Sequence, residues 1–237
     1  VINSHVHLES FINLENNKLI IDENYFNINE NSNLAIKIEN LKFKYFNSED
    51  LIFDNLNLEI KKNKHTVITG PNGSGKSTLL GLISKVFYPQ EGKITSYSEK
   101  VGYVGVTPLI LNGSLRDNFM YGNTTKKDDA DLIKLMEQFE LFNSDDIDLN
   151  YQVNNKSLSS GQMQKVAFIR SLLADVEILL LDESTSNLDV SSRKLIFEIL
   201  SKKNITIINS THSHEDFSYD EHLRIVLKDD KRLFVSS

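Results

Sequence analysis

The segment that most restricts the fold of this chain is a glycine-rich stretch that follows an apolar run. It reads Gly70, Pro71, Asn72, Gly73, Ser74, Gly75, Lys76, Ser77, Thr78, which fits G-x-x-x-x-G-K-[ST] at every position. The run 65–69 before it is typical of a strand, and the apolar positions after it, 79, 80 and 83, have helical spacing. This order predicts a loop whose backbone N–H groups, with the helix N-terminus, surround phosphate oxygens.

Two polar side chains of this stretch have roles that phosphate chemistry suggests. Lys76 is expected to reach the β- and γ-phosphates of a nucleotide, and the Ser77 hydroxyl to coordinate Mg²⁺. All of the positions from Gly70 to Thr78 are predicted to contact the nucleotide. The alternative is a glycine-rich turn that binds nothing, and the Lys-Ser pair at the required place disfavours it.

A pair of acids ends a second apolar run. Asp182 and Glu183 follow Ile178–Leu181 directly, and a strand directs successive side chains to opposite faces, so the two acids are free to differ in role. Asp182 is predicted to hold Mg²⁺, and Glu183 to act as general base or to polarise the attacking water. A solvated turn after a strand is the alternative, which the phosphate loop makes less favoured.

The spacing of apolar residues predicts an α/β fold. Residues 35–39 and 56–60 alternate apolar with polar, as half-buried strands do, whereas 176–181 and 205–208 are continuous apolar runs, as in strands covered on both faces. Helical spacing appears between these runs. We therefore expect a mixed α/β domain with a helical insertion between two parts of its sheet.

Composition excludes several classes of function. The 237 residues contain 26 Lys and Arg against 33 Asp and Glu, a formal charge of −7, which disfavours nucleic acid as a partner. The absence of Cys excludes a disulfide framework, a thiolate metal site and a cysteine nucleophile. No apolar stretch approaches the ~20 residues of a membrane-spanning helix. His5 and His7 have metal-ligand spacing, but no nearby residues complete a site.

A third motif carries a resemblance to a known family. Leu158-Ser159-Ser160-Gly161-Gln162 resembles the L-S-G-G-Q signature of the nucleotide-binding domain of ABC transporters, with Ser160 in place of the first glycine. In that family two domains dimerise head to tail, and the signature of one caps the ATP on the other's phosphate loop. The resemblance implies this role for Ser159, Ser160, Gly161 and Gln162. From the residues alone, Ser-Ser at this place is more often a plain helix N-cap.

Three further positions match the family in order along the chain. The resemblance implies that Tyr45 stacks on adenine, that Asp189 belongs to a loop at the dimer interface, and that His212 contacts the γ-phosphate and orients the catalytic centre. The residue types alone leave other interpretations open. Tyr45 is also an ordinary strand aromatic, and a single histidine after a strand is usually a surface residue.

Besides Ser160, the sequence departs from the family pattern at two further places, and at another it agrees with one branch of the family. Val106 stands where the family has a glutamine that helps to position Mg²⁺ and water, and valine has no polar group for either task. The segment 151–157 lacks the acid that exporters commonly carry before the signature. Residues 112–118, Asn-Gly-Ser-Leu-Arg-Asp-Asn, resemble a segment of exporter-type members.

The resemblance implies the ATP-hydrolysing domain of an exporter-type ABC transporter at residues 34–237. Its expected fold is α/β: a P-loop NTPase core with a mixed or parallel sheet, an N-terminal antiparallel β subdomain and a helical insertion subdomain at about 109–172. Residues 1–33, with nine Asn and five acids to one Lys, are expected to be a leader that links it to a transmembrane domain upstream of Val1. The expected cofactors are ATP and Mg²⁺, the expected partner a second such domain, like or unlike, and the expected location the cytoplasmic face of a membrane.

Two other functions remain under consideration. The first is a nucleotide-gated switch that hydrolyses slowly or not at all, which Val106 favours. The second is a soluble ABC-type ATPase that works on DNA or ribosomes. Such chains typically have long coiled-coil insertions or two domains in tandem, and this sequence has neither.

Overall fold

A six-stranded sheet forms the centre of the computed structural model, which describes residues 25–46, 48–123, 126–142, 148–212, 214–228 and 231–236. Its strand order is β12-β11-β4-β10-β9-β6, and every neighbouring pair is parallel except β11 and β12. The bounds are β4 His65–Thr69, β6 Val101–Val104, β9 Ile178–Asp182, β10 Thr206–Ser210, β11 Glu221–Lys228 and β12 Lys231–Ser236. The prediction of an α/β fold around a mixed or parallel sheet is confirmed.

A second sheet has the order β1-β5-β2-β3. Its strands are β1 Phe26–Ile28, β2 Leu34–Phe43, β3 Phe53–Lys61 and β5 Glu91–Ser96. Strand β2 is antiparallel to both β3 and β5, as expected for the N-terminal β subdomain, whereas β1 pairs with β5 in parallel.

Strand β1 lies before Leu34, the predicted start of the folded domain. It begins eight residues earlier and pairs through Phe26, Asn27 and Ile28 with β5. A three-residue strand with a central asparagine is too short to show the alternation that identifies a strand in sequence. Residues 1–24 of the predicted leader, with His5 and His7, lie outside the described residues.

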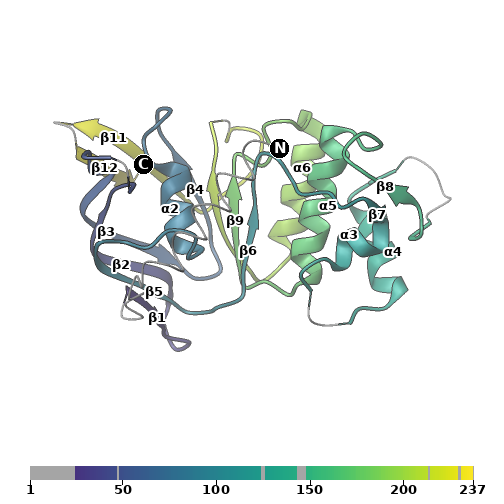
Figure 1. Cartoon of the computed structure of the whole chain (residues 1–237), viewed down its shortest axis with the longest axis horizontal. Helices are drawn as coiled ribbons and strands as arrows, with labels where there is room; N and C mark the ends of the chain where they lie inside the picture. The colour runs from purple at the N-terminus through teal and green to yellow at the C-terminus, as the bar shows by residue number, and fades with distance from the viewer. Residues whose placement is uncertain are drawn as a thin grey trace.

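Helical elements occupy the region predicted as an insertion. It contains α3 Leu115–Met120, α4 Asp129–Gln138 and α5 Ser160–Leu173, with a small sheet formed by β7 Gly113–Ser114 and β8 Gln152–Val153. Together with α6 Val190–Ser201, these elements lie on the right in Figure 1.

The two faces of the central sheet are covered by different elements. Ile178 and Leu180 of β9 belong to the core shared with α2 (Lys76–Ile83) and the second sheet, whereas Leu179 and Leu181 belong to the core shared with α5 and α6. Figure 1 shows α2 on one side of β4, β9 and β6, and α5 and α6 on the other. Burial on both faces explains why β9 is a continuous apolar run.

No helix within the described residues combines the length and the apolar character needed to cross a membrane.

Candidate nucleotide-binding site

The glycine-rich loop connects the end of β4 to the start of α2. Gly73 and Gly75 have φ values of 73° and 98°, in the left-handed region that glycine adopts without strain. A Cβ at Gly75 would lie 3.0 Å from Cζ of Phe53 and 3.2 Å from Cγ2 of Ile52. The loop therefore depends on glycine at position 75, both for its backbone conformation and for its close approach to β3.

Helix α2 begins without a side-chain cap. Its N-cap is Gly75, no side chain accepts a hydrogen bond from its first turn, and that turn contains no acid. The other helices of the described region are each capped by a side chain, namely α3 by Ser114, α4 by Asp128, α5 by Ser159 and α6 by Asp189. The uncapped N–H groups and the helix dipole fit an anionic ligand such as phosphate.

Lys76 lies over the loop that precedes it. Its side chain is nearly buried, at 5% exposure, and Nζ donates to the carbonyl oxygens of Gly70 at 3.0 Å and Pro71 at 3.2 Å. Both acceptors are neutral carbonyl oxygens, so these two hydrogen bonds hold the ammonium group at the loop without neutralising its charge. This arrangement suits binding of a phosphate oxygen.

Ser77 and Asp182 are brought together from positions 105 residues apart. Ser77 Oγ donates to Oδ1 of Asp182 at 2.9 Å, and Asp182 is largely buried at the end of β9. Hydroxyl and carboxylate oxygens are the ligands that Mg²⁺ prefers, so the two residues fit the predicted metal site.

Tyr103, which the sequence analysis did not identify, also contacts Asp182. Its hydroxyl donates to Oδ2 at 2.7 Å from strand β6. Burial, followed by the hydrogen bond and charge of Asp182, raises the pKa of Tyr103 above its usual value. No local motif marks this residue, because its position depends on β6 lying beside β9.

Glu183 and His212 are in direct contact. His212 Nε2 lies 3.1 Å from Oε1 of Glu183, and both side chains are partly exposed. Glu183 has a φ of 50°, and its N–H donates to the carbonyl of Ser210 on β10 at 2.9 Å. The backbone of Glu183 is therefore attached to the strand that leads to His212, which brings the predicted base and histidine together.

Tyr45 lies against the same loop. Its hydroxyl is 2.7 Å from Thr78 Oγ1, and its ring makes edge contacts with Phe43 and Phe87 at centroid distances of 5.2 and 5.5 Å. Tyr45 is 41% exposed, so part of the ring remains available to a ligand.

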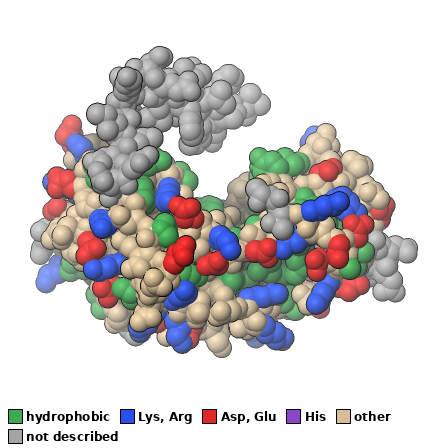
Figure 2. Space-filling view, turned by 90° about the horizontal axis from the view of Figure 1, so that it is seen from below, with side chains coloured by type: hydrophobic (Ala, Val, Ile, Leu, Met, Phe, Trp, Pro, Cys, Tyr) green, Lys and Arg blue, Asp and Glu red, His purple; other side chains and the backbone are tan. Residues whose placement is uncertain are grey.

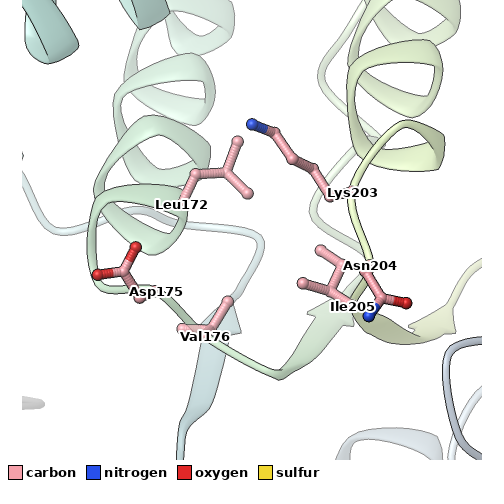
Figure 3. A pocket seen from close by; sticks show the side chains of 6 residues that line it. All are labelled: Leu172, Asp175, Val176, Lys203, Asn204 and Ile205. Atoms are coloured by element: carbon pink, nitrogen blue, oxygen red, sulfur yellow. The ribbon is translucent and has the colours of Figure 1, made fainter.

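Seven of the nine predicted phosphate-loop residues, Asn72 to Thr78, line one cavity of about 300 Å³, whereas Gly70 and Pro71 are not among its lining residues. Its lining consists of Tyr45, Ile52, Asn72, Gly73, Ser74, Gly75, Lys76, Ser77, Thr78 and Glu183. A second cavity, of about 260 Å³, lies before the amino ends of β9 and β10, where Leu172 and Ile205 extend toward one another (Figure 3). None of the predicted site residues lines this second cavity.

The signature residues lie at the start of α5 and do not line the cavity at the phosphate loop. The Ser159 hydroxyl accepts from the N–H of Gln162 at 3.2 Å, and the Gln162 side chain accepts from the N–H of Ser159 at 2.9 Å. Ser159 is therefore the N-cap of α5, as one interpretation of the sequence predicted. The hydroxyl proton is not used by that cap, so it can still be donated to a phosphate. Both Ser159 and Ser160 are exposed.

Asp189 caps helix α6. Its carboxylate accepts hydrogen bonds from the Ser191 hydroxyl and from the N–H and hydroxyl of Ser192. These hydrogen bonds, led by that of Ser191, hold the pKa of Asp189 well below its usual range. The exposed carboxylate therefore remains charged at the surface.

The turn after β6 is attached to α5. Gln164, fully buried on α5, donates through Nε2 to the carbonyls of Gly105 at 3.1 Å and Val106 at 2.8 Å. The Val106 side chain itself is 42% exposed. The sequence analysis missed Gln164, whose only signal is its place two residues after the signature.

Comparisons with known proteins agree with this geometry. A sequence model of the family described as ABC transporter matches residues 53–186, more than half of the chain. ABC transporter B family member 22 of Arabidopsis thaliana is 33% identical over 186 residues, which are 70% of this chain and 15% of that protein. A putative export ATP-binding/permease protein of Rickettsia conorii is 28% identical over 240 residues, 93% of this chain and 42% of that protein.

One solved structure is similar over most of the chain. It is described as a bacterial Atm1-family ABC exporter with ATP bound, and it superposes with a TM-score of 0.75 at 22% identity, over 89% of this chain and 40% of that one. At this identity the likeness shows the fold. The chain spans less than half the length of each of these relatives.

Proposed function

This chain belongs to the ABC transporter family, and we propose that it binds and hydrolyses ATP to drive transport by an exporter-type member. The observation that supports this function best is the convergence of four side chains from three parts of the chain. Ser77 contacts Asp182, and Glu183, next in sequence, contacts His212, all beside the phosphate loop.

Each of these residues has a part in the proposed reaction. The loop from Gly70 to Thr78 binds the phosphates, Lys76 supplies positive charge to them, and Tyr45 stacks on adenine. Ser77 and Asp182 hold Mg²⁺, which neutralises charge on the phosphates when it is bound. Glu183 accepts the proton of the attacking water, and His212, whose Nε2 lies 3.1 Å from Oε1 of Glu183, orients that carboxylate toward the γ-phosphate.

The separation of the two nucleotide-binding motifs favours a dimer. The signature at the start of α5 and the loop at the start of α2 lie on opposite faces of the central sheet. One chain therefore does not close its own signature over its own ATP. In the proposed assembly a second nucleotide-binding domain presents Ser159 and its neighbours to the bound ATP, with Asp189 at the interface, and hydrolysis releases the two domains.

The proposed transporter also has a transmembrane domain, upstream in the same protein, with this domain at the cytoplasmic face of the membrane. The relative from Rickettsia is an export ATP-binding/permease protein of which this chain matches 42%. More than half of that relative lies outside the match, which leaves room in it for a membrane-embedded part.

The proposal includes no nucleic-acid partner. On the face drawn in Figure 2, Lys and Arg side chains are interspersed with Asp and Glu. This face does not present the continuous basic stripe that binding to a phosphate backbone uses.

Substitution of Glu183 tests the proposed catalysis. Glu183→Gln keeps the shape of the side chain and removes its basicity, so we expect ATP binding to be retained and steady-state hydrolysis to fall by about 100-fold or more. Glu177→Gln is the matched control, because Glu177 immediately precedes β9 and its carboxylate forms an ion pair with the exposed Lys100 at 3.1 Å, away from the site. Unchanged hydrolysis in Glu183→Gln would overturn the assignment of the base.

A nucleotide-gated switch is the second candidate, and the exposed apolar side chain of Val106 favours it. Val106→Gln restores an amide at this position. A large rise in hydrolysis relative to the wild type would support the switch, whereas an unchanged rate would support an ordinary ATPase.

A further inference from the structure

Tyr103 reaches the predicted metal site from the neighbouring strand. In the parallel pairing of β6 and β9, Tyr103 is opposite Leu180, two residues before Asp182. Side chains two residues apart on a strand share a face, so Tyr103, Leu180 and Asp182 face the same side, toward α2. The tyrosine ring spans this offset and places its hydroxyl 2.7 Å from Oδ2 of Asp182.

The two oxygens of the Asp182 carboxylate therefore have different partners. Oδ1 accepts from Ser77 of α2, and Oδ2 accepts from Tyr103 of β6. When Ser77 turns its oxygen toward a cation, its hydrogen bond to Asp182 is exchanged for coordination. The hydrogen bond from Tyr103 does not depend on that exchange, so it persists while Oδ1 changes partner.

The strand that carries Tyr103 is itself held in place. Val104, the next residue, is buried, and the carbonyls of Gly105 and Val106 accept from the buried side chain of Gln164. The backbone that carries Tyr103 is thus held both in strand β6 and in the turn that follows it.

We propose that Tyr103 is a positioning residue for the metal site, whose hydroxyl holds Oδ2 of Asp182 so that Oδ1 faces Mg²⁺ beside Ser77. This inference rests on the proposed ATP-binding function and adds a residue to it. A carboxylate that is already held loses less freedom when it binds a cation, so removal of the hydroxyl weakens metal binding without removing a metal ligand.

The test compares two tyrosine variants. Tyr103→Phe removes the hydroxyl that contacts Asp182, and Tyr97→Phe removes one that donates to the carbonyl of Glu177 at 2.8 Å, before the opposite end of β9. The wild-type chain and both variants are saturated with a non-hydrolysable ATP analogue and titrated with Mn²⁺, with bound Mn²⁺ measured by electron paramagnetic resonance. Binding of the analogue in EDTA is measured separately.

We expect Tyr103→Phe to raise the half-saturating Mn²⁺ concentration by about ten- to hundredfold, the loss typical of removing a hydrogen-bond partner of a metal ligand. Analogue binding in EDTA stays within about twofold of the wild type, and Tyr97→Phe leaves the Mn²⁺ titration unchanged. An unchanged titration in Tyr103→Phe, or an equal shift in both variants, overturns the proposal and leaves ATP binding intact. Failure of the wild type to bind the analogue in either condition overturns the proposed function, and this inference with it.

Discussion

Helices α2 and α5 are both proposed to meet phosphate at their first turn, yet they begin differently. Gly75 starts α2 in a left-handed conformation with no side-chain cap. Ser159 starts α5 in an extended conformation, and Ser159 and Gln162 form a reciprocal capping box. The first turn of α2 keeps its N–H groups available to a ligand, whereas that of α5 satisfies two of its own donors.

The two helix starts also differ in burial. Lys76 is 5% exposed within a lined cavity, whereas Ser159 and Ser160 are exposed on the surface. A preformed cavity suits a ligand that binds one domain, and a capped, exposed turn suits one that arrives with a second domain. In the proposed assembly, this difference favours nucleotide binding first at α2, with α5 contributing afterwards.

The largest expected effect tests the α2 site. Lys76→Ala removes the positive charge from the loop, so we expect nucleotide affinity of the isolated domain to fall by about 100-fold, as for loss of a charge-assisted hydrogen bond in a buried site. Isothermal titration with MgATP measures the change.

Lys165→Ala is the matched control for this charge. Lys165 is also nearly buried and also donates to a backbone carbonyl, that of Glu140 at 2.9 Å, but it lies on α5. We expect its removal to lower stability by about 1 kcal/mol and to leave nucleotide affinity unchanged. Equal losses of affinity in the two variants would contradict the distinction between the helices.

The next effect is a pH dependence of stability that arises at His65. This residue belongs to β4 of the central sheet, on which both α2 and α5 pack, so the two helix starts can be compared only where the sheet is stable. Burial of its ring, stacked on Phe197 and Phe217, lowers the pKa of His65 to about 4, although the nearby Asp220 acts in the opposite direction. Between about pH 6.5 and pH 4 the unfolded chain therefore binds a proton that the folded chain does not.

Stability is consequently expected to fall as the pH falls through this window, by up to about 3 kcal/mol from this residue. His65→Phe keeps an aromatic ring and cannot titrate. Denaturant unfolding at several pH values measures the free energy of unfolding, and the variant should show the smaller slope between pH 6.5 and 4. Parallel slopes for the two proteins would refute this role of His65.

The smallest effect separates the two roles of Ser159. Ser159→Ala removes both the cap and the hydroxyl proposed to meet the partner's ATP, and Ser114→Ala removes an equivalent capping box, formed with Asp117, at α3. Both variants should lose about 1 kcal/mol of stability. Only Ser159→Ala should also lower ATP-dependent dimerisation, which size-exclusion chromatography in a Glu183→Gln background measures. Equal dimerisation in both variants would leave Ser159 with the cap alone.

Much of the site could be predicted because its chemistry is carried by contiguous residues. The loop around Lys76, the Asp182-Glu183 pair and the serine cap at Ser159 each follow from local patterns. Tyr103 and Gln164 carried no such pattern, since their contacts depend on which strand and helix lie beside them. Strand β1 was missed for a related reason, because its three residues gain a strand conformation only by pairing with β5.

The sequence was sufficient to define a phosphate-binding turn, two acids after a buried strand and an α/β fold, because turn, helix and strand preferences act over a few residues. It did not specify that Ser77, Tyr103 and Asp182 meet at one carboxylate, or that α2 and α5 cover opposite faces of one sheet. Those relations follow from the strand order, with β9 between β6 and β10, and strand order is set by packing between residues far apart in the chain. The convergence of the proposed catalytic residues and the separation that favours a partner are both properties of the tertiary structure.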